Sequence, residues 1–262
     1  MTQLEPHTVR GRTVRACTSA RMPYAGSGAL VFSLFLAITA CGGDDGNAST
    51  DAGADAAADA PSGCDPATLL PNNYRPIPMV STGTVAITTT GTVMAGTIDA
   101  TAGGTASSAD RPYIYVDLEA GVRVDVDDLA ARSSSAWDIM LKRSSIRSNG
   151  GDSGPGKRTI AVMPGATLAT VAAPASGYQT DDFTTADCML DAIPGGEPKS
   201  AFGEWYDYDA NTHAVTPKGE VYVIERDDGT RTAFRVATYY GDTAMPMRGA
   251  YYSVEWKQLP PR

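Results

Sequence analysis

The sequence feature that most constrains the fold is a hairpin pattern between Val221 and Tyr240. Val221–Arg226 is rich in β-branched and aromatic residues, and a similar run, Thr232–Tyr240, follows after Asp227-Asp228-Gly229. An Asp-Gly pair supplies the positive φ angles that a tight hairpin turn requires. Two such runs around a turn signal predict a pair of antiparallel strands, and a chain built on such pairs folds into sheets.

The same pattern recurs from about residue 69 onward. Further strands are predicted at Thr82–Thr89 and Thr92–Asp99 around Gly91, at Tyr113–Leu118 and Val122–Val126 around Ala120-Gly121, and at Tyr251–Trp256. Only Asp127–Ser135 and Ala186–Ile193 offer short helical stretches. We therefore predict that residues 69–262 form a single all-β domain, dominated by strands and carrying one or two short helices.

The first forty residues differ from this domain. Gly28–Ala40 is an uncharged run that follows Arg10, Arg12, Arg15 and Arg21. A transmembrane helix needs roughly 20 apolar residues, so this run is too short to span a bilayer. A basic segment followed by a short apolar one is typical of a secretory signal. Residues 1–40 are therefore predicted to be an export signal.

The end of this signal resembles the lipobox of bacterial lipoproteins. Ile38-Thr39-Ala40 precedes Cys41, and in a lipobox small residues precede the cysteine that is diacylated and becomes the new N-terminus. Two acyl chains provide the hydrophobic anchor that stable membrane attachment needs. The alternative is an ordinary cleaved signal with a fortuitous cysteine. Because Gly42 and Gly43 carry no acidic retention signal, we expect an outer-membrane lipoprotein, periplasm-facing or surface-exposed.

Residues 41–68 are predicted to be a lipidated cysteine followed by a disordered tether. The stretch from Gly42 to about Pro66 consists mainly of Gly, Asp, Ala, Ser and Thr and has no aromatic residue. Such a stretch cannot bury enough apolar surface to offset its ordering entropy. Its aspartates lack the spacing and the terminal glutamate of a calcium loop. The chain carries a net charge of −9, which argues against nucleic acid as a partner.

Two cysteines remain for the exported domain. Cys17 lies in the predicted signal and Cys41 is assigned to lipid, which leaves Cys64 and Cys188. An exported protein enters a compartment that permits disulfides. We predict a Cys64–Cys188 disulfide that ties the end of the tether to the domain. The alternative is that Cys64 is a free thiol in a flexible segment.

The sequence contains no convincing catalytic or metal-binding constellation. Gly151–Pro155 (GDSGP) is similar to the nucleophile motif of trypsin-like proteases, but that chemistry needs a histidine base that precedes the serine. The expected mature chain has one histidine, His213, which follows Ser153. No cysteine pair has the spacing of a zinc site. The adjacent pairs Asp181-Asp182 and Asp227-Asp228 are interpreted as turn and surface charge, so we expect a protein that is not an enzyme.

The aromatic residues of the C-terminal third allow two interpretations. They either pack in the core and at the edge of a sheet, which we favour, or line a ligand groove. The residues concerned are Trp205, Tyr206, Tyr208, Tyr239, Tyr240, Tyr251, Tyr252 and Trp256.

A series of short motifs resembles the signature of the HmuY family. Trp137-Asp138-Ile139 is followed by Arg143, and then by Asn149-Gly150-Gly151 and Ser153-Gly154. The order continues with Gly177-Tyr178, Trp205–Tyr208, Thr212-His213, Thr216–Lys218, Val221–Ile224, Asp228-Gly229 and Tyr239-Tyr240. We interpret the segment around Trp137 as structural, with Trp137, Ile139 and Leu141 on one buried face. The resemblance implies a lipid-anchored, β-rich surface protein of a family whose best-known members are hemophores.

The resemblance also implies where heme ligands would lie. Hemophores of the family hold heme iron with two histidines or methionines, one between the counterparts of Tyr178 and Trp205 and one just beyond Trp205. The first segment holds Met189 and no histidine, and the second is followed by His213. Met189 and His213 are therefore the candidate heme ligands, and a bis-histidine site within one chain is excluded. We expect a domain that binds heme, a porphyrin or another small hydrophobic ligand; the alternative is a structural or adhesion-type envelope module without heme.

Overall fold

The computed structural model describes residues 64–101, 109–241 and 249–260. The chain divides into two compact units, Met1–Ala54 and Asp55–Arg262, and every described residue belongs to the second. The predicted signal, Cys41 and residues 42–63 of the predicted tether lie outside the described residues. Within the described ranges, the helices are all too short or too polar to cross a membrane.

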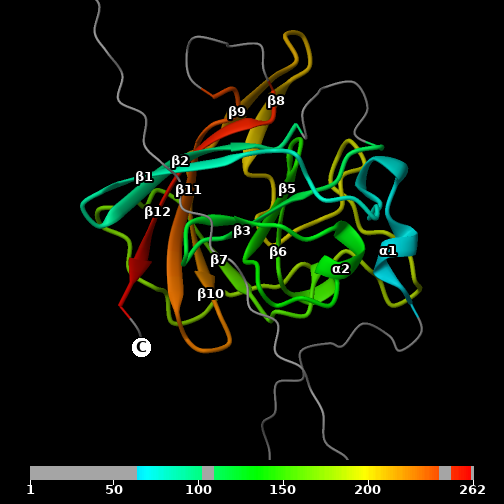
Figure 1. Ribbon diagram of the computed structural model, residues 1–262, viewed down its shortest axis with the longest axis horizontal. Helices are drawn as coiled ribbons and strands as arrows, with labels where there is room; N and C mark the ends of the chain where they lie inside the picture. The colour runs from blue at the N-terminus through cyan, green and yellow to red at the C-terminus, as the bar shows by residue number, and fades with distance from the viewer. Residues whose placement is uncertain (1–63, 102–108, 242–248, 261–262) are drawn as a thin grey trace, which may run out of the picture. The chain divides into compact units, whose positions relative to one another are not determined.

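The larger sheet contains six antiparallel strands in the order β1-β2-β12-β11-β10-β7 (Figure 1). Its strands are β1 (Val85–Thr90), β2 (Val93–Asp99), β7 (Thr159–Met163), β10 (Val221–Glu225), β11 (Arg231–Thr238) and β12 (Tyr251–Leu259). The C-terminal strand β12 inserts between β2 and β11, so it joins the first predicted hairpin to the last one.

A second sheet contains four strands in the order β4-β3-β5-β6, and β8 and β9 form a separate hairpin. These strands are β3 (Ile114–Asp117), β4 (Val122–Val124), β5 (Ile139–Lys142), β6 (Ser145–Ser148), β8 (Tyr206–Asp209) and β9 (Ala214–Pro217). The described helices are α1 (Pro66–Leu69), α2 (Asp128–Ala131) and the 3₁₀ turns η1 (Asn72–Tyr74) and η2 (Gly151–Ser153). In Figure 1 the β8–β9 hairpin lies at the top and α1 at the right.

The main core lies between the two sheets. Ile114 and Leu141 of the smaller sheet join Trp256 of the larger one in a single buried cluster. Strand β10 is buried on both faces, because Tyr222 and Ile224 belong to this cluster whereas Val221 and Val223 pack against residues 166–173. This double burial explains why β10 is a continuous apolar run.

The predicted fold class is confirmed: the described part of the chain is β-dominated, with two short α-helices. All three predicted hairpins form, and Gly91, Gly121 and Gly229 adopt the positive φ angles that their turns need. The predicted helix at Asp127–Ser135 is present as α2, capped by Asp127. The predicted helix at Ala186–Ile193 is wrong. That segment consists of turns and isolated bridges, because Cys188 has a φ of 56° and the bridge from Thr184 to Leu190 folds the chain back on itself.

The interpretation of the Trp137 segment needs one correction. Ile139 and Leu141 enter the main core, but Trp137 packs with Tyr115 and Met140 on the opposite face of the smaller sheet. The strict alternation fails because Trp137 precedes the first residue of β5. The structural interpretation itself holds, since the Asn149 amide donates to the Trp137 carbonyl at 2.8 Å and its oxygen accepts from the Gly156 amide at 2.9 Å.

The boundary between tether and domain also moves. Residues 64–68 were expected to belong to the disordered tether, yet they lead into and form most of α1. The Asp65 side chain caps this helix through the amide of Ala67, and Pro66 occupies its first turn, a position that proline favours. Residues 66–68 therefore belong to the folded domain.

Candidate functional site

The β8–β9 hairpin carries the predicted ligand residue His213. Tyr206 pairs with Pro217 and Tyr208 with Val215, and the two tyrosines, two residues apart on β8, lie on the same face of the hairpin. The turn is closed by the Asp209 carboxylate, which accepts from the amide of Asn211 at 2.8 Å. Hydrogen bonds from turn amides lower the pKa of Asp209, the Asn211 bond contributing most. His213 then adopts a φ of 57° at the end of the turn.

The imidazole of His213 is held by a neighbouring tyrosine. Tyr208 Oη lies 2.6 Å from His213 Nδ1, and both side chains are exposed. A hydrogen bond at one imidazole nitrogen fixes the ring and determines which nitrogen is free to bind a metal. When Nδ1–H donates to the Tyr208 hydroxyl, the proton of the neutral ring is on Nδ1. Nε2 then keeps its lone pair, and this hydrogen bond does not use it. The arrangement is therefore suited to ligation through Nε2.

His213 lines a groove of about 520 Å³ beside the hairpin, called the His213 groove below. Its lining consists largely of aromatic side chains and the turn between β5 and β6: Arg143, Ser144, Tyr206, Tyr208, Thr212, His213, Ala214, Val215, Tyr239, Tyr240 and Gly249. Tyr240 is fixed there by accepting the Val215 amide at 2.8 Å, and its ring meets Tyr239 edge to face at 5.1 Å. The volume lies within the range of about 300–1,000 Å³ that is usual for ligand pockets.

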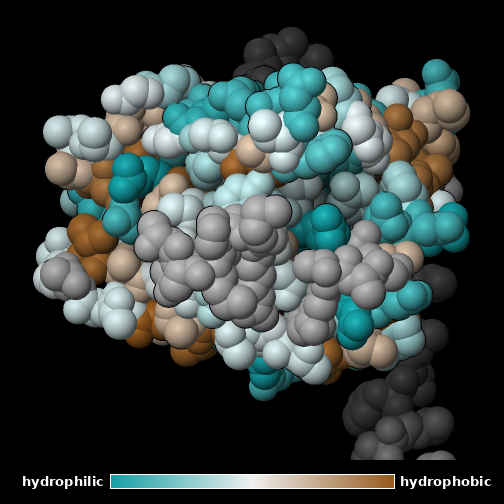
Figure 2. Space-filling model, turned by 90° about the horizontal axis from the view of Figure 1, so that it is seen from above, coloured by the Kyte–Doolittle hydropathy of each residue, from teal (hydrophilic) through white to brown (hydrophobic). Residues whose placement is uncertain are grey.

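A second groove of about 470 Å³, the Glu197 groove, shares Ser144, Tyr206 and Tyr208 with the first. It is also lined by Tyr74 and by the loop at Ile193–Gly195. Glu197 is buried and accepts from Ser144 Oγ at 3.1 Å, and burial raises the pKa of its carboxyl group. The β8–β9 hairpin extends toward the top of Figure 1, and Figure 2 shows the molecule from that side. Hydrophobic residues are scattered there among hydrophilic ones.

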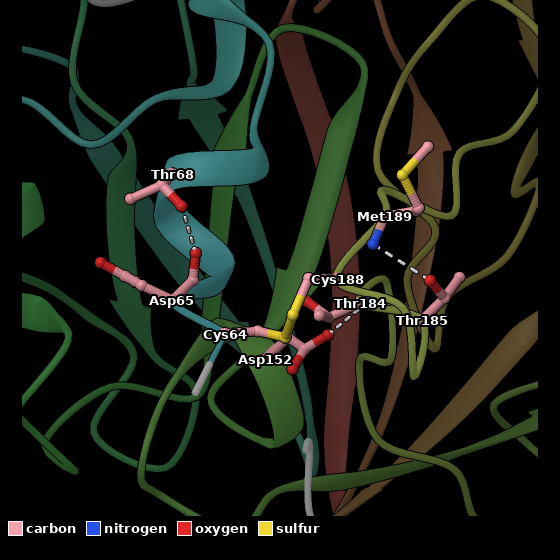
Figure 3. Close-up of a disulfide and its surroundings, with 8 residues drawn as sticks. All are labelled: Cys64, Asp65, Thr68, Asp152, Thr184, Thr185, Cys188 and Met189. Atoms are coloured by element: carbon pink, nitrogen blue, oxygen red, sulfur yellow. Dashed lines mark hydrogen bonds between the residues drawn. A yellow bond between two sulfur atoms is a disulfide. The ribbon is translucent and has the colours of Figure 1, made fainter. Parts of the chain in front are cut away.

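The other predicted ligand residue, Met189, lies elsewhere. Its side chain is 63% exposed and lines neither groove. Figure 3 shows the side chain pointing away from the neighbouring disulfide, while its amide donates to Thr185 Oγ1 at 3.1 Å. The structure thus places His213 at a groove and Met189 on the surface, and the role of Met189 as a ligand stays a prediction.

The predicted disulfide is confirmed. Cys64 and Cys188 are bonded, with their Cα atoms 5.6 Å apart, a separation usual for disulfides (Figure 3). The bond joins Cys64, two residues before α1, to the loop that carries Met189. It therefore attaches the N-terminal end of the described region to a segment 124 residues further along the chain.

The residues considered for catalysis have structural roles. Ser153 is buried in η2, and the neighbouring Asp152 carboxylate accepts the amides of Phe183 and Thr184 at 2.8 and 2.7 Å. The interpretation of Asp181 as surface charge is wrong. Asp181 is fully buried. Its carboxylate accepts hydrogen bonds from the amides of Ser148 and Ala201, and so joins β6 to a distant loop. Within the described ranges, no group of three or more His, Cys, Asp or Glu side chains could hold a metal ion.

The aromatic residues divide between the core and the two grooves, and whether these grooves bind a ligand stays a prediction. Trp205, Tyr252 and Trp256 are buried in the main core. Tyr206 and Tyr208 line both grooves, and Tyr239 and Tyr240 line the His213 groove. Sequence reasoning missed the contribution of Arg143, whose position in the turn after β5 brings it to the groove. The motif that contains it is visible in the sequence, but its place in the groove beside the β8–β9 hairpin is not.

The site and fold are those of a two-sheet β protein with ligand-sized grooves beside an aromatic hairpin. The model of the HmuY protein family matches residues 110–251, more than half of the chain, so the chain belongs to the HmuY family. No curated protein matches it.

Several solved structures are similar to this chain. A Bacteroides fragilis protein is 17% identical with a TM-score of 0.44, covering 66% of this chain and 94% of its own. The apo HmuY analog of Tannerella forsythia has the same identity and TM-score, with 63% and 95% covered. Apo PinO from Porphyromonas gingivitis is 15% identical with a TM-score of 0.41, covering 70% and 99%. The family assignment rests on the sequence match.

Proposed function

We propose that this protein is an exported, lipid-anchored binding protein that takes up heme or a related planar hydrophobic ligand in the His213 groove. The observation that carries the proposal is the hydrogen bond between Tyr208 and His213 at the rim of a groove walled by aromatic rings. Binding rather than catalysis is favoured because the groove offers apolar walls and one oriented imidazole. Membership of the HmuY family agrees with this reading.

The residues of the groove fit a porphyrin in two respects. Imidazole is a common ligand of heme iron, and His213 is the one histidine of the groove. The tyrosine rings offer flat surfaces for stacking, and Arg143 at the same groove supplies a cation for an anionic substituent of the ligand. Iron held through Nε2 of His213 would give the bound heme its spectroscopic signature. Among the described residues that line the groove, His213 is the only histidine or methionine that would hold the iron.

The proposal is tested by titrating hemin into the protein and recording the Soret band. We expect a shifted band in the wild type and its loss in His213→Ala. In Tyr208→Phe we expect the band to persist with affinity lower by about tenfold or more, the usual effect of losing the hydrogen-bond partner of a metal-ligating histidine. Met189→Ala tests the other predicted ligand, and Met79→Ala is its matched control, since Met79 is also half exposed.

The outcomes separate the alternatives. A Soret shift that survives His213→Ala removes this residue as the ligand, and a shift lost only in Met189→Ala assigns that role to Met189. A wild type that binds neither hemin nor protoporphyrin IX favours the alternative function of a structural or adhesion-type envelope module. Binding of protoporphyrin IX without any effect of His213→Ala would indicate a porphyrin site that does not use iron ligation.

A further inference from the structure

A separate cavity of about 320 Å³ lies on the outer face of the smaller sheet. Its floor contains Tyr113, Tyr115 and Arg147, which belong to or adjoin strands β3 and β6. Pro66, Ala67 and Leu70 line it from α1 and the residue that follows, and Phe183 and the turn at residues 151–155 complete it. None of these residues lines the His213 groove.

The distinctive member of this cavity is Arg147. Its side chain is 2% exposed, and its guanidinium lies over the rings of Tyr113 and Phe183, at 4.8 and 5.4 Å from their centroids. It donates one hydrogen bond, to the Tyr113 hydroxyl. Among the described residues, Nε has no hydrogen-bond partner and no carboxylate lies within 4.0 Å of the guanidinium. A buried cation without a paired anion is costly, and five N–H donors leave capacity for an external acceptor.

Two buried carboxylates in the surroundings of Arg147 are committed to other groups. Asp128 accepts the amides of Tyr113 and Ile77, at 3.0 and 3.1 Å, and the hydroxyl of Tyr115 at 3.0 Å. Asp181 accepts two backbone amides, as described above. Burial raises the pKa of each of these carboxyls to about 6. Asp181 and Glu197 moderate the charge of Arg147 from a distance but do not occupy its donors.

We propose that this cavity, the Arg147 pocket, binds a small carboxylate with an aromatic or aliphatic body. The carboxylate accepts hydrogen bonds from the free donors of Arg147, and the body packs against Phe183, Leu70 and the tyrosine rings. Paired N–H groups of a guanidinium match the two oxygens of a carboxylate, which makes arginine the usual residue for this recognition. This inference is independent of the function proposed for the His213 groove.

The segment Cys64–Leu70 forms the lid of the pocket. It is attached at its start by the Cys64–Cys188 disulfide (Figure 3). The ion pair of Asp65 with Arg132 fixes it further. Beyond it the chain is fixed by the Tyr113 hydroxyl, which donates to the Tyr74 carbonyl at 3.1 Å. The ligand is thus enclosed by a helix that is covalently fixed at one end, and loss of the disulfide weakens its closure.

The proposal is tested by NMR titration of the full chain with indole-3-acetate and with the neutral indole-3-acetamide as matched probe. We expect indole-3-acetate to shift the Arg147 Nε–H resonance and to bind about tenfold tighter than the amide, as expected for a charge-assisted hydrogen bond. Arg147→Met should remove this preference. Ala67→Phe, which fills the pocket from the lid and leaves Arg147 in place, should abolish binding of both probes.

His213→Ala is the control for the other groove and should leave both titrations unchanged. In Cys64→Ser/Cys188→Ser the affinity for indole-3-acetate should fall, because the lid is no longer held. The proposal is overturned if neither probe binds, if both bind equally well, or if binding of indole-3-acetate survives Ala67→Phe. If Arg147→Met does not fold, comparing the affinities of the two probes for the wild type and for Ala67→Phe still tests the proposal.

Discussion

The carboxylate of Asp138 accepts a hydrogen bond from Arg226 Nε at 2.8 Å, and this contact joins the two sheets. Asp138 directly precedes β5 of the smaller sheet, whereas Arg226 follows β10 of the larger one. The same carboxylate accepts from Arg158 Nε at 3.0 Å and from the Leu118 amide at 2.8 Å. Asp138 is 1% exposed, so its charge is compensated entirely by these partners. The Asp of the Trp137-Asp138-Ile139 motif therefore has a structural role.

We predict that Asp138→Asn lowers the free energy of unfolding by about 3–5 kcal/mol, because Arg158 and Arg226 lose the buried carboxylate that they share. The carboxylates that remain to them, Asp117, Glu119 and Asp227, are all more exposed. Chemical denaturation of the variant and the wild type measures this difference. Asp125→Asn is the matched control: Asp125 pairs with Arg123 at the surface and is 68% exposed, so about 1 kcal/mol or less is expected. Equal effects of the two substitutions would contradict the role assigned to Asp138.

The strands were predictable because their signals are local. The turns at Gly91, Gly121 and Gly229 are each encoded within a few residues of the strands they join, and all three hairpins form. The helix predicted at Ala186–Ile193 does not form, because contacts with other segments outweigh the helical preference of its residues. Its Asp191 amide donates to the Phe183 carbonyl, and Cys188 is bonded to Cys64.

The site was only partly predictable, for a related reason. His213 could be singled out as the lone histidine of the expected mature chain. Its hydrogen bond with Tyr208 forms only in the folded hairpin, and Tyr240, which also lines the groove, comes from the segment after β11. Arg147 gave no signal, because a charged residue in Ser145–Ser148 is typical of an exposed strand. Asp181 was likewise taken for surface charge. Burial of a charge depends on which segments cover it, and that information is not local.

The disulfide should contribute strongly to stability. It closes a loop with a sequence separation of 124 residues, and removal of a native disulfide typically costs about 2–5 kcal/mol. We expect Cys64→Ser/Cys188→Ser to lower the free energy of unfolding by this amount in chemical denaturation. Wild-type protein treated with reductant should coincide with the double variant. If both thiols of the unreduced, unfolded wild type react with an alkylating reagent, the bond is absent in solution.

Membrane attachment is predicted to depend on Cys41, which lies outside the described residues. Cys41→Ser should release a soluble form or leave an unprocessed precursor, because the thiol that receives the lipid is gone. Metabolic labelling with palmitate measures this directly, and the label should disappear from the variant. Cys17→Ser, which changes a cysteine inside the predicted signal, is the control and should keep the label. Labelling that persists in Cys41→Ser would show that another residue is acylated.

Lys142 supplies a pH-dependent prediction. Its side chain is 1% exposed, and among the described residues its ammonium has no hydrogen-bond partner, lying 5.0 Å from the centre of the Tyr113 ring. Burial lowers the pKa of Lys142 from 10.5 to about 8, with Asp128 opposing the change and Arg147 adding to it. The folded protein thus gives up this proton at a lower pH than the unfolded chain does. Below pH 8 the lysine is charged in both states, and its burial destabilises the fold in full.

We therefore expect Lys142→Met to raise the free energy of unfolding by about 2–4 kcal/mol at pH 7, since each unit of pKa shift corresponds to about 1.4 kcal/mol. The advantage of the variant should decline as the pH rises from 8 to 10.5, because the wild-type lysine is then neutral first in the folded state and finally in both. Denaturation of both proteins across this range measures the difference. Lys199→Met, at a surface ion pair with Asp191, should show little effect at any pH. A difference between Lys142→Met and wild type that stays constant up to pH 10.5 would mean that packing, not the buried charge, accounts for it.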